Sequence, residues 1–200
     1  GARVAGLCGA CVAVILLAGT ARLAAESSFA VDGPTLCLQG TLAIVGAVGI
    51  LVLGERSLDG SGGAVVARAS TTPGSRADVL LAESSDVQTE VFPLAMFSLG
   101  GMMLFPAANN LLLMFVALEV LSFPLYLMAG LARRRRLLSQ EAAVKYFLLG
   151  SFASAFFIYG VALLYGYAGS VELGTIFAAT GLAGSNDALL FLGIAMLSVG

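Results

Sequence analysis

Residues 111–168, LLLMFVALEVLSFPLYLMAGLARRRRLLSQEAAVKYFLLGSFASAFFIYGVALLYGYA, consist of two apolar runs, Leu111–Ala132 and Ala142–Ala168, with a basic segment between them. Each run is longer than the roughly 18 residues that cross a bilayer as a helix. Backbone N–H and C=O groups in lipid have to be satisfied within the segment, and neither run shows the alternation of polar and apolar residues that barrel strands need. This part of the chain therefore predicts two consecutive transmembrane helices.

The rest of the chain is similarly apolar. Hydrophobic residues make up 59% of the sequence and charged residues 11%, whereas about 25% of the residues in a soluble domain are charged. A chain of this length cannot hide so much apolar surface in its interior, so lipid has to cover much of it. We expect an all-α, polytopic transmembrane helical bundle, with residues 1–200 as a single transmembrane domain fragment and a flexible cytoplasmic loop at residues 54–90. The other predicted spans are Val4–Ala21, Leu36–Leu53, Val91–Ala108 and Ala188–Gly200.

The arginines predict the orientation of these spans. If the gaps between spans alternate between the two sides of the membrane, Arg22 is the one arginine on its side. The other side receives Arg3, the arginines of residues 54–90 and the run Arg133–Arg136. Basic residues accumulate in cytoplasmic loops, so we expect the Arg133–Arg136 loop in the cytoplasm. The alternative to this role as an orientation anchor is that Arg133–Arg136 binds anionic lipid or a partner.

Two formal charges, Glu119 and Lys145, lie inside the predicted spans. A charge at mid-membrane costs about 2.5–3.5 kcal/mol, so such a residue usually faces a partner or a water-filled cavity. At helical spacing Glu119 shares a face with Ser122 and Tyr126, and Pro124 is expected to kink or loosen the helix one turn further on. These features suit a proton relay. The structural alternative is a permanently protonated Glu119 that makes an interhelical hydrogen bond.

Lys145 is expected near the cytoplasmic start of its helix. Ser139 is the predicted N-cap of that helix, which puts Glu141 in the first turn, near the positive helix end. Glu141 and Lys145 are spaced i, i+4 and could form an ion pair. Apart from Glu141, the Lys145 ammonium has no partner on its own predicted helix. It therefore either snorkels to the cytoplasm or meets a group on another helix, and spacing alone leaves both open.

Nothing else in the sequence indicates chemistry. The chain has no histidine, and we interpret the lone C-x-x-C of Cys8 and Cys11 as small apolar helix residues and not as a metal or haem site. Neither a phosphate loop nor a dinucleotide fingerprint is present, and a net charge of −2 gives no indication of nucleic acid. A proton- or ion-translocating subunit and a passive membrane scaffold remain as functional classes. We expect close packing between helices, and no chemical role, at five small residues: Gly100, Gly101, Gly150, Ser154 and Gly160.

Residues 110–170 closely resemble the N subunit of bacterial NADH-quinone oxidoreductase, respiratory complex I. The pattern L-E-x-L-S-x-P-L-Y, a basic turn, S-x-E-A-x-x-K-Y-F-x-L-G-S and Y-G-x-x-L-L-Y-G carries the resemblance. Upstream, AVDGPTLCLQG and EVFPLAMFSLGGMMLFPAANN are similar to the same subunit in its actinobacterial form. The similarity is weakest in the first 25 residues and in residues 54–90.

The resemblance implies one of the antiporter-like membrane subunits that couple quinone reduction elsewhere in the complex to proton translocation. Such subunits contain inverted repeats with broken helices, and this chain would hold part of one repeat, without the first helix or anything after the start of the seventh. The acid and the lysine of the family map onto Glu119 and Lys145. In the family the acid pairs with a further lysine, which we expect just past Gly200. The family often has an acid where this chain has Asn110, which puts an outer-exit role for that position in doubt.

The same resemblance implies a location and partners. We expect a bacterial inner membrane, contacts with the lipid bilayer and other membrane subunits of complex I, and no nucleic acid. NADH, flavin, iron–sulfur clusters and quinone are expected in other subunits, with no cofactor in this chain. A subunit of a multi-subunit cation/proton antiporter, which shares the fold, is the alternative, although the S-x-E-A-x-x-K-Y-F-x-L-G-S pattern favours the quinone-linked subunit.

Overall fold

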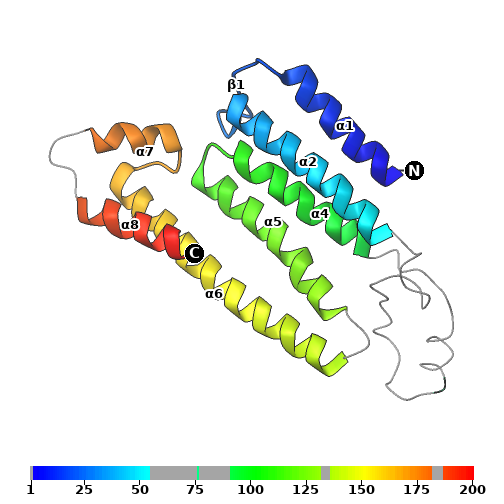
Figure 1. Ribbon diagram of the computed structural model, residues 1–200. Coiled ribbons are helices and arrows are strands. Elements are labelled where there is room, and N and C mark those ends of the chain that lie inside the picture. The colour runs from blue at the N-terminus through cyan, green and yellow to red at the C-terminus, as the bar shows by residue number, and fades with distance from the viewer. Residues whose placement is uncertain (1, 55–75, 77–90, 132–135, 182–186) are drawn as a thin grey trace.

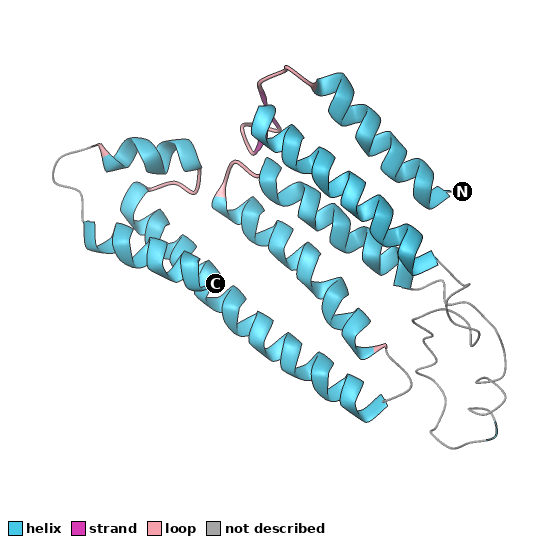
Figure 2. Ribbon diagram, in the orientation of Figure 1, coloured by secondary structure: helices cyan, strands magenta, loops and turns pink. Residues whose placement is uncertain are grey.

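The computed structural model describes residues 2–54, 76, 91–131, 136–181 and 187–200. Over these ranges the chain is helical apart from one small hairpin, so the predicted all-α membrane bundle is confirmed (Figure 2). The predicted loop at residues 54–90 and the arginines Arg133–Arg135 lie almost entirely outside the described ranges. The helices are α1 (Ala2–Leu17), α2 (Gly33–Gly54), α4 (Val91–Leu104), α5 (Leu111–Gly130), α6 (Arg136–Ala168), α7 (Leu173–Thr180) and α8 (Asp187–Val199), with the 3-10 turn η1 (Phe105–Ala107).

The long helices lie side by side in one row (Figure 1). In this row α2 packs between α1 and α4, and α5 packs between α4 and α6. The short helix α7 and helix α8 pack against α6, at the end of the row away from α1. Among the described elements, helix α6 therefore contacts α5 along one side, α8 over its C-terminal half and the short helix α7.

Among the described helices, three are long and apolar enough to cross a membrane. They cover Gly33–Leu53, Leu111–Gly130 and Leu138–Ala168, and the shorter apolar helices are Val91–Ala107 and Asp187–Val199. The predicted span Val4–Ala21 is shorter than expected, because α1 ends at Leu17 and Gly19 adopts a positive φ of 84°. The chain is thus an integral membrane protein with helices of unequal length.

Much of the apolar surface stays exposed along the row of helices. On α2, Val45 and Val52 are exposed by 63% and 67%, and on α6 Leu149 is exposed by 69%. The buried core consists of small clusters, one between α2 and α4 and one where α5, α6 and α7 meet. Lipid is the natural cover for faces of this kind, because they would be insoluble in water.

A β-hairpin that the sequence analysis did not predict connects α1 to α2. Its strands β1 (Arg22–Ala24) and β2 (Phe29–Val31) are antiparallel, and its turn contains three successive non-glycine residues, Ala25, Glu26 and Ser27, with φ of 50°, 53° and 68°. Side-chain crowding disfavours this left-handed conformation. The turn is held from outside, because Asn109 donates its backbone N–H to Ser28 O at 2.8 Å and its Nδ2 to Ser27 O at 2.8 Å.

Further caps tie the same end of the bundle together. Asn110 caps α5, since its Oδ1 accepts from Leu113 N at 2.7 Å. Asp32 caps α2 and accepts from Thr35 N at 2.9 Å. Hydrogen bonds from the hydroxyl and then the backbone N–H of Thr35 hold the pKa of Asp32 below its ordinary value of 3.8. Gly169 follows α6 with φ of 69°, which a residue with a Cβ rarely adopts.

The ends of α6 differ from the prediction. The helix begins at Arg136, so Ser139 is not its N-cap and Glu141 is not in its first turn. Arginine is a good helix former and extends the helix toward its N-terminus. Ser139 instead donates its hydroxyl to Ala129 O at 2.6 Å, which joins α6 to the last turn of α5. Helix α7 is a second unpredicted element, anchored by the buried Ile176.

Candidate functional site

The seam between α5 and α6 is made close by glycine. A Cβ at Gly150 of α6 would overlap the hydroxyl of Tyr126 on α5 and would lie 2.5 Å from its Cζ. Close packing is also confirmed at Gly101, where a Cβ would lie 2.8 Å from Leu121 Cα, and at Gly160, where it would lie 2.8 Å from Leu197 N. The prediction for Gly100 was wrong, since no atom of the described residues lies within 4 Å of a Cβ there.

Glu119 lies in this seam, half-buried on α5. Its Oε1 accepts a hydrogen bond from Ser154 Oγ of α6 at 2.5 Å. The carboxyl group therefore points at a neighbouring helix, as expected for an acid within a membrane span. The spacing argument had given Ser154 a packing role alone and missed this contact, because a contact between two helices leaves no periodic pattern in either one.

Tyr126 faces the same seam two turns further along α5. Its side chain is 9% exposed, and its ring meets those of Tyr146 and Phe147 edge-on, with centroids 4.7 Å and 5.9 Å apart. Ser122 is half-buried between Glu119 and Tyr126 in the sequence of α5. The predicted stripe of acid and phenol thus faces α6.

Pro124 lies inside α5, and the kinking or loosening of the helix that its sequence position predicts stays a prediction. The helix continues from Leu111 to Gly130 with Pro124 buried inside it. Helix α4 supports this region from the other side, because Ser98, 1% exposed, donates its hydroxyl to Leu121 O at 3.0 Å. The backbone of α5 is therefore enclosed by a neighbouring helix where the proline removes a hydrogen bond.

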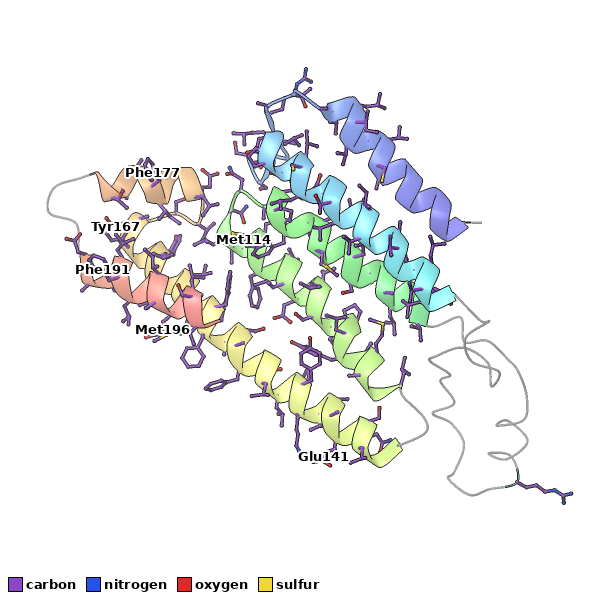
Figure 3. The ribbon with its side chains drawn as sticks, viewed as in Figure 1. Met114, Glu141, Tyr167, Phe177, Phe191 and Met196 are labelled. Atoms are coloured by element: carbon purple, nitrogen blue, oxygen red, sulfur yellow. The ribbon has the colours of Figure 1, made fainter. Side chains whose placement is uncertain are left out.

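Lys145 pairs with Glu141, as the i, i+4 spacing predicted. The Nζ to Oε1 distance is 2.5 Å, and the side chains are 69% and 56% exposed. In Figure 3 Glu141 lies on the side of α6 away from α5. Glu119 and Lys145 consequently have different partners, Ser154 and Glu141, and the structure does not bring the two intramembrane charges together.

No metal centre emerges from the part of the chain that the structure describes. It contains no group of three or more His, Cys, Asp or Glu side chains that could hold an ion. Cys11 and Cys37 are free thiols. The described polar side chains inside the membrane-length helices are a carboxyl group, hydroxyls, the Gln39 amide and one exposed ion pair.

Comparison with known proteins identifies relatives over the whole chain. A family described as "NADH:quinone oxidoreductase/Mrp antiporter, TM" matches residues 108–200. NADH-quinone oxidoreductase subunit N of a Parafrankia species is 60% identical over 196 residues, which cover 98% of this chain and 37% of the relative. The subunit N of Acidothermus cellulolyticus is 54% identical over 195 residues, covering 97% of this chain and 37% of the relative. The chain thus spans little more than a third of these relatives.

Solved structures agree with this similarity. Respiratory complex I from Thermus thermophilus with bound aureothin contains a chain that is 31% identical, with a TM-score of 0.68, over 100% of this chain and 36% of that one. A chain of the membrane-bound sulfane sulfur reductase, an archaeal respiratory membrane complex, has a TM-score of 0.68 at 17% identity, over 98% of this chain and 37% of that one. The second similarity concerns the fold alone.

Proposed function

This chain belongs to the family of subunit N of NADH-quinone oxidoreductases, and on that premise we propose that it is part of a proton-translocating membrane subunit of respiratory complex I. The observation that carries the proposal is the hydrogen bond from Ser154 Oγ to Glu119 Oε1, 2.5 Å long, which joins two helices that are long and apolar enough to cross a membrane. An acid at such a place is expensive, and its orientation toward another helix suits a group that exchanges a proton.

In this proposal Glu119 receives and releases a proton in exchange with a base supplied by the part of the subunit beyond Gly200. The end of α8 favours this, because Gly200 packs closely on the turn of α6 that carries Ser154. A Cβ at Gly200 would lie 2.5 Å from Phe157 N and 2.7 Å from Ala153 O. A base carried along this path would approach the turn of α6 that contacts Glu119 through Ser154.

Lys145 has a separate role in the proposal, which is to help load protons from the cytoplasmic side. Its ion pair with Glu141 is more than half exposed on both sides, so it is weak and readily broken. Snorkelling toward the cytoplasm remains the alternative use of this long side chain. The sidedness follows from the arginine distribution, with the Arg133–Arg136 loop in the cytoplasm of a bacterium and the helices in its inner membrane.

The remaining parts of the reaction belong to partners. We assign NADH, flavin, iron–sulfur clusters and quinone to other subunits of the complex, and proton transfer to this one. Its exposed apolar helix faces would contact lipid and the neighbouring membrane subunits. The family description also includes Mrp antiporters, but the relatives of 54–60% identity are named as subunit N, which favours the quinone-linked complex over a cation/proton antiporter.

Substitution of Glu119 in the complete subunit tests this function against a passive scaffold. Glu119→Gln keeps the shape and can still accept from Ser154, but it cannot carry a proton. We expect normal amounts of assembled complex with proton pumping reduced several-fold. Undiminished pumping at a normal rate of quinone reduction would leave the scaffold as the better account. The role of Lys145 is tested separately with the variants Lys145→Ala and Lys145→Arg. If both variants assemble and pump normally, Lys145 only snorkels to the cytoplasm and takes no part in proton transfer.

A further inference from the structure

Ser154 donates its hydroxyl to a carboxyl side chain, whereas Ser98 and Ser139 donate theirs to backbone carbonyls of a neighbouring helix. Serine and threonine hydroxyls within a helix commonly donate to the backbone carbonyl one turn earlier. Ser198 of α8 and Thr41 of α2 follow this habit, donating to Ile194 O at 2.8 Å and to Cys37 O at 2.9 Å. Ser154 instead donates across the seam to Glu119 Oε1. Its hydroxyl is therefore committed to the carboxyl group and not to its own helix.

The surroundings of Glu119 offer this carboxyl group few other partners. Helix α4, which packs on the opposite side of α5, has no ionisable side chain between Val91 and Leu104. On α6 the described charges nearest in sequence are Glu141 and Lys145, which pair with each other. Among the described residues, the hydroxyl of Ser154 is thus the polar group that fixes where the Glu119 carboxyl group points.

A serine hydroxyl at this position can keep the same hydrogen bond in both protonation states of Glu119. It donates to Oε1 of the carboxylate, and it also donates to Oε1 of the neutral acid, because this carbonyl oxygen stays an acceptor when the proton is on Oε2. Unlike a lysine or an arginine, the hydroxyl carries no charge that would favour the ionised form. The contact between Ser154 and Glu119 can consequently survive a change in the protonation of Glu119, with Oε2 left as the oxygen that exchanges the proton.

We propose that Ser154 is a positioning residue for proton transfer, which holds Oε1 of Glu119 against α6 in both protonation states and leaves Oε2 to exchange the proton. This inference rests on the proposed function, because it assigns Ser154 a role in the same relay. It differs from a packing role, since a serine needed only for close approach of two helices could be replaced by alanine without a change in the behaviour of Glu119.

The test uses the complete subunit in the assembled complex, reconstituted in vesicles. Ser154→Ala should lower the number of protons pumped per NADH oxidised, by at most the share that this subunit contributes, with normal assembly, and Ser154→Thr should restore it because the hydroxyl returns. Ser98→Ala is the matched control. It also removes a serine hydroxyl donated to α5, at Leu121 O, but it does not touch Glu119. We expect normal pumping per NADH in the control.

A spectroscopic measurement separates positioning from packing. The infrared band of the Glu119 carboxyl group, identified by its loss in Glu119→Gln, should shift in Ser154→Ala and return in Ser154→Thr. Ser154→Ala added to Glu119→Gln should cause no further loss of pumping, since the two act as one unit. If Ser154→Ala prevents assembly, Ser154→Cys, similar in size but a weak donor, should assemble and pump less than Ser154→Thr.

The possible failures can be told apart. Normal pumping and an unshifted carboxyl band in Ser154→Ala, with pumping impaired in Glu119→Gln, would overturn the role of Ser154 and leave the proposed function standing. Equal pumping by the cysteine and threonine variants would also overturn it. Normal pumping in Glu119→Gln itself would overturn the proposed function.

Discussion

Gly150→Ala should destabilise the subunit through the α5–α6 seam. The new methyl group would overlap the Tyr126 hydroxyl and lie 2.5 Å from Tyr126 Cζ. Tyr126 cannot swing aside freely, because its ring is 9% exposed and lies edge-on between Tyr146 and Phe147. Overpacking of this kind costs about 1–3 kcal/mol. Alanine is better than glycine in a helix by about 0.8–1.0 kcal/mol, which offsets part of the cost.

Comparison with Gly166→Ala separates the overpacking cost of Gly150→Ala from the helix-propensity gain of alanine over glycine. Gly166→Ala makes the same substitution in the same helix, at a position where no atom of the described part of the chain lies within 4 Å of the new Cβ. The helix preference cancels between the two variants, so Gly150→Ala should be less stable than Gly166→Ala by the full overpacking cost of about 1–3 kcal/mol. The measurement is thermal unfolding of the complete subunit in detergent. Adding Tyr126→Phe to Gly150→Ala should recover part of the loss, because the hydroxyl goes but Cζ stays. Equal stability of the two glycine variants would refute the close approach of α5 and α6.

Three further predictions concern the helix ends and the exposed ion pair. Because the pKa of Asp32 is lowered in the folded state, its cap contributes this stability at pH values above the ordinary pKa of 3.8 and loses it as the pH falls through the folded-state pKa. Asp32→Asn should keep the cap and abolish this acid dependence, as measured by unfolding at a series of pH values. Asn110→Ala should cost about 1 kcal/mol in thermal unfolding, since Leu113 N loses its acceptor, and Asn110→Ser should recover most of it. Glu141→Gln should change stability by less than about 1 kcal/mol because the pair with Lys145 is exposed, so a larger loss would mean that this pair is buried in the assembled complex.

The sequence predicted the helical membrane fold because apolar runs of sufficient length leave the backbone no other way to satisfy its polar groups in lipid. It also predicted the pair of Glu141 and Lys145, since residues four apart on a helix are neighbours. The sequence did not predict the N-terminus of α6 correctly. Ser139 looked like an N-cap, but α6 already begins at Arg136 and Ser139 donates its hydroxyl to Ala129 O instead.

The features that the sequence missed depend on contacts between distant segments. The hairpin at residues 22–31 has three non-glycine residues in its left-handed turn, and Asn109, far along the chain, holds that turn in place. The hydrogen bond between Ser154 and Glu119 joins residues 35 positions apart. Spacing along either helix places Glu119 on a polar face but cannot say which residue of the next helix lies opposite. Roles for Glu119 and Lys145 in proton transfer stay predictions.

The number of protons translocated per NADH oxidised, measured in vesicles carrying the Glu119→Gln complex, tests the central claim most directly. Both quantities come from the same vesicles, so poor assembly lowers them together and leaves their ratio unchanged. If Glu119 exchanges protons during turnover, the ratio should fall while NADH oxidation continues. A ratio equal to that of the unmodified complex would contradict the account and would make the hydrogen bond between Glu119 and Ser154 a structural contact alone.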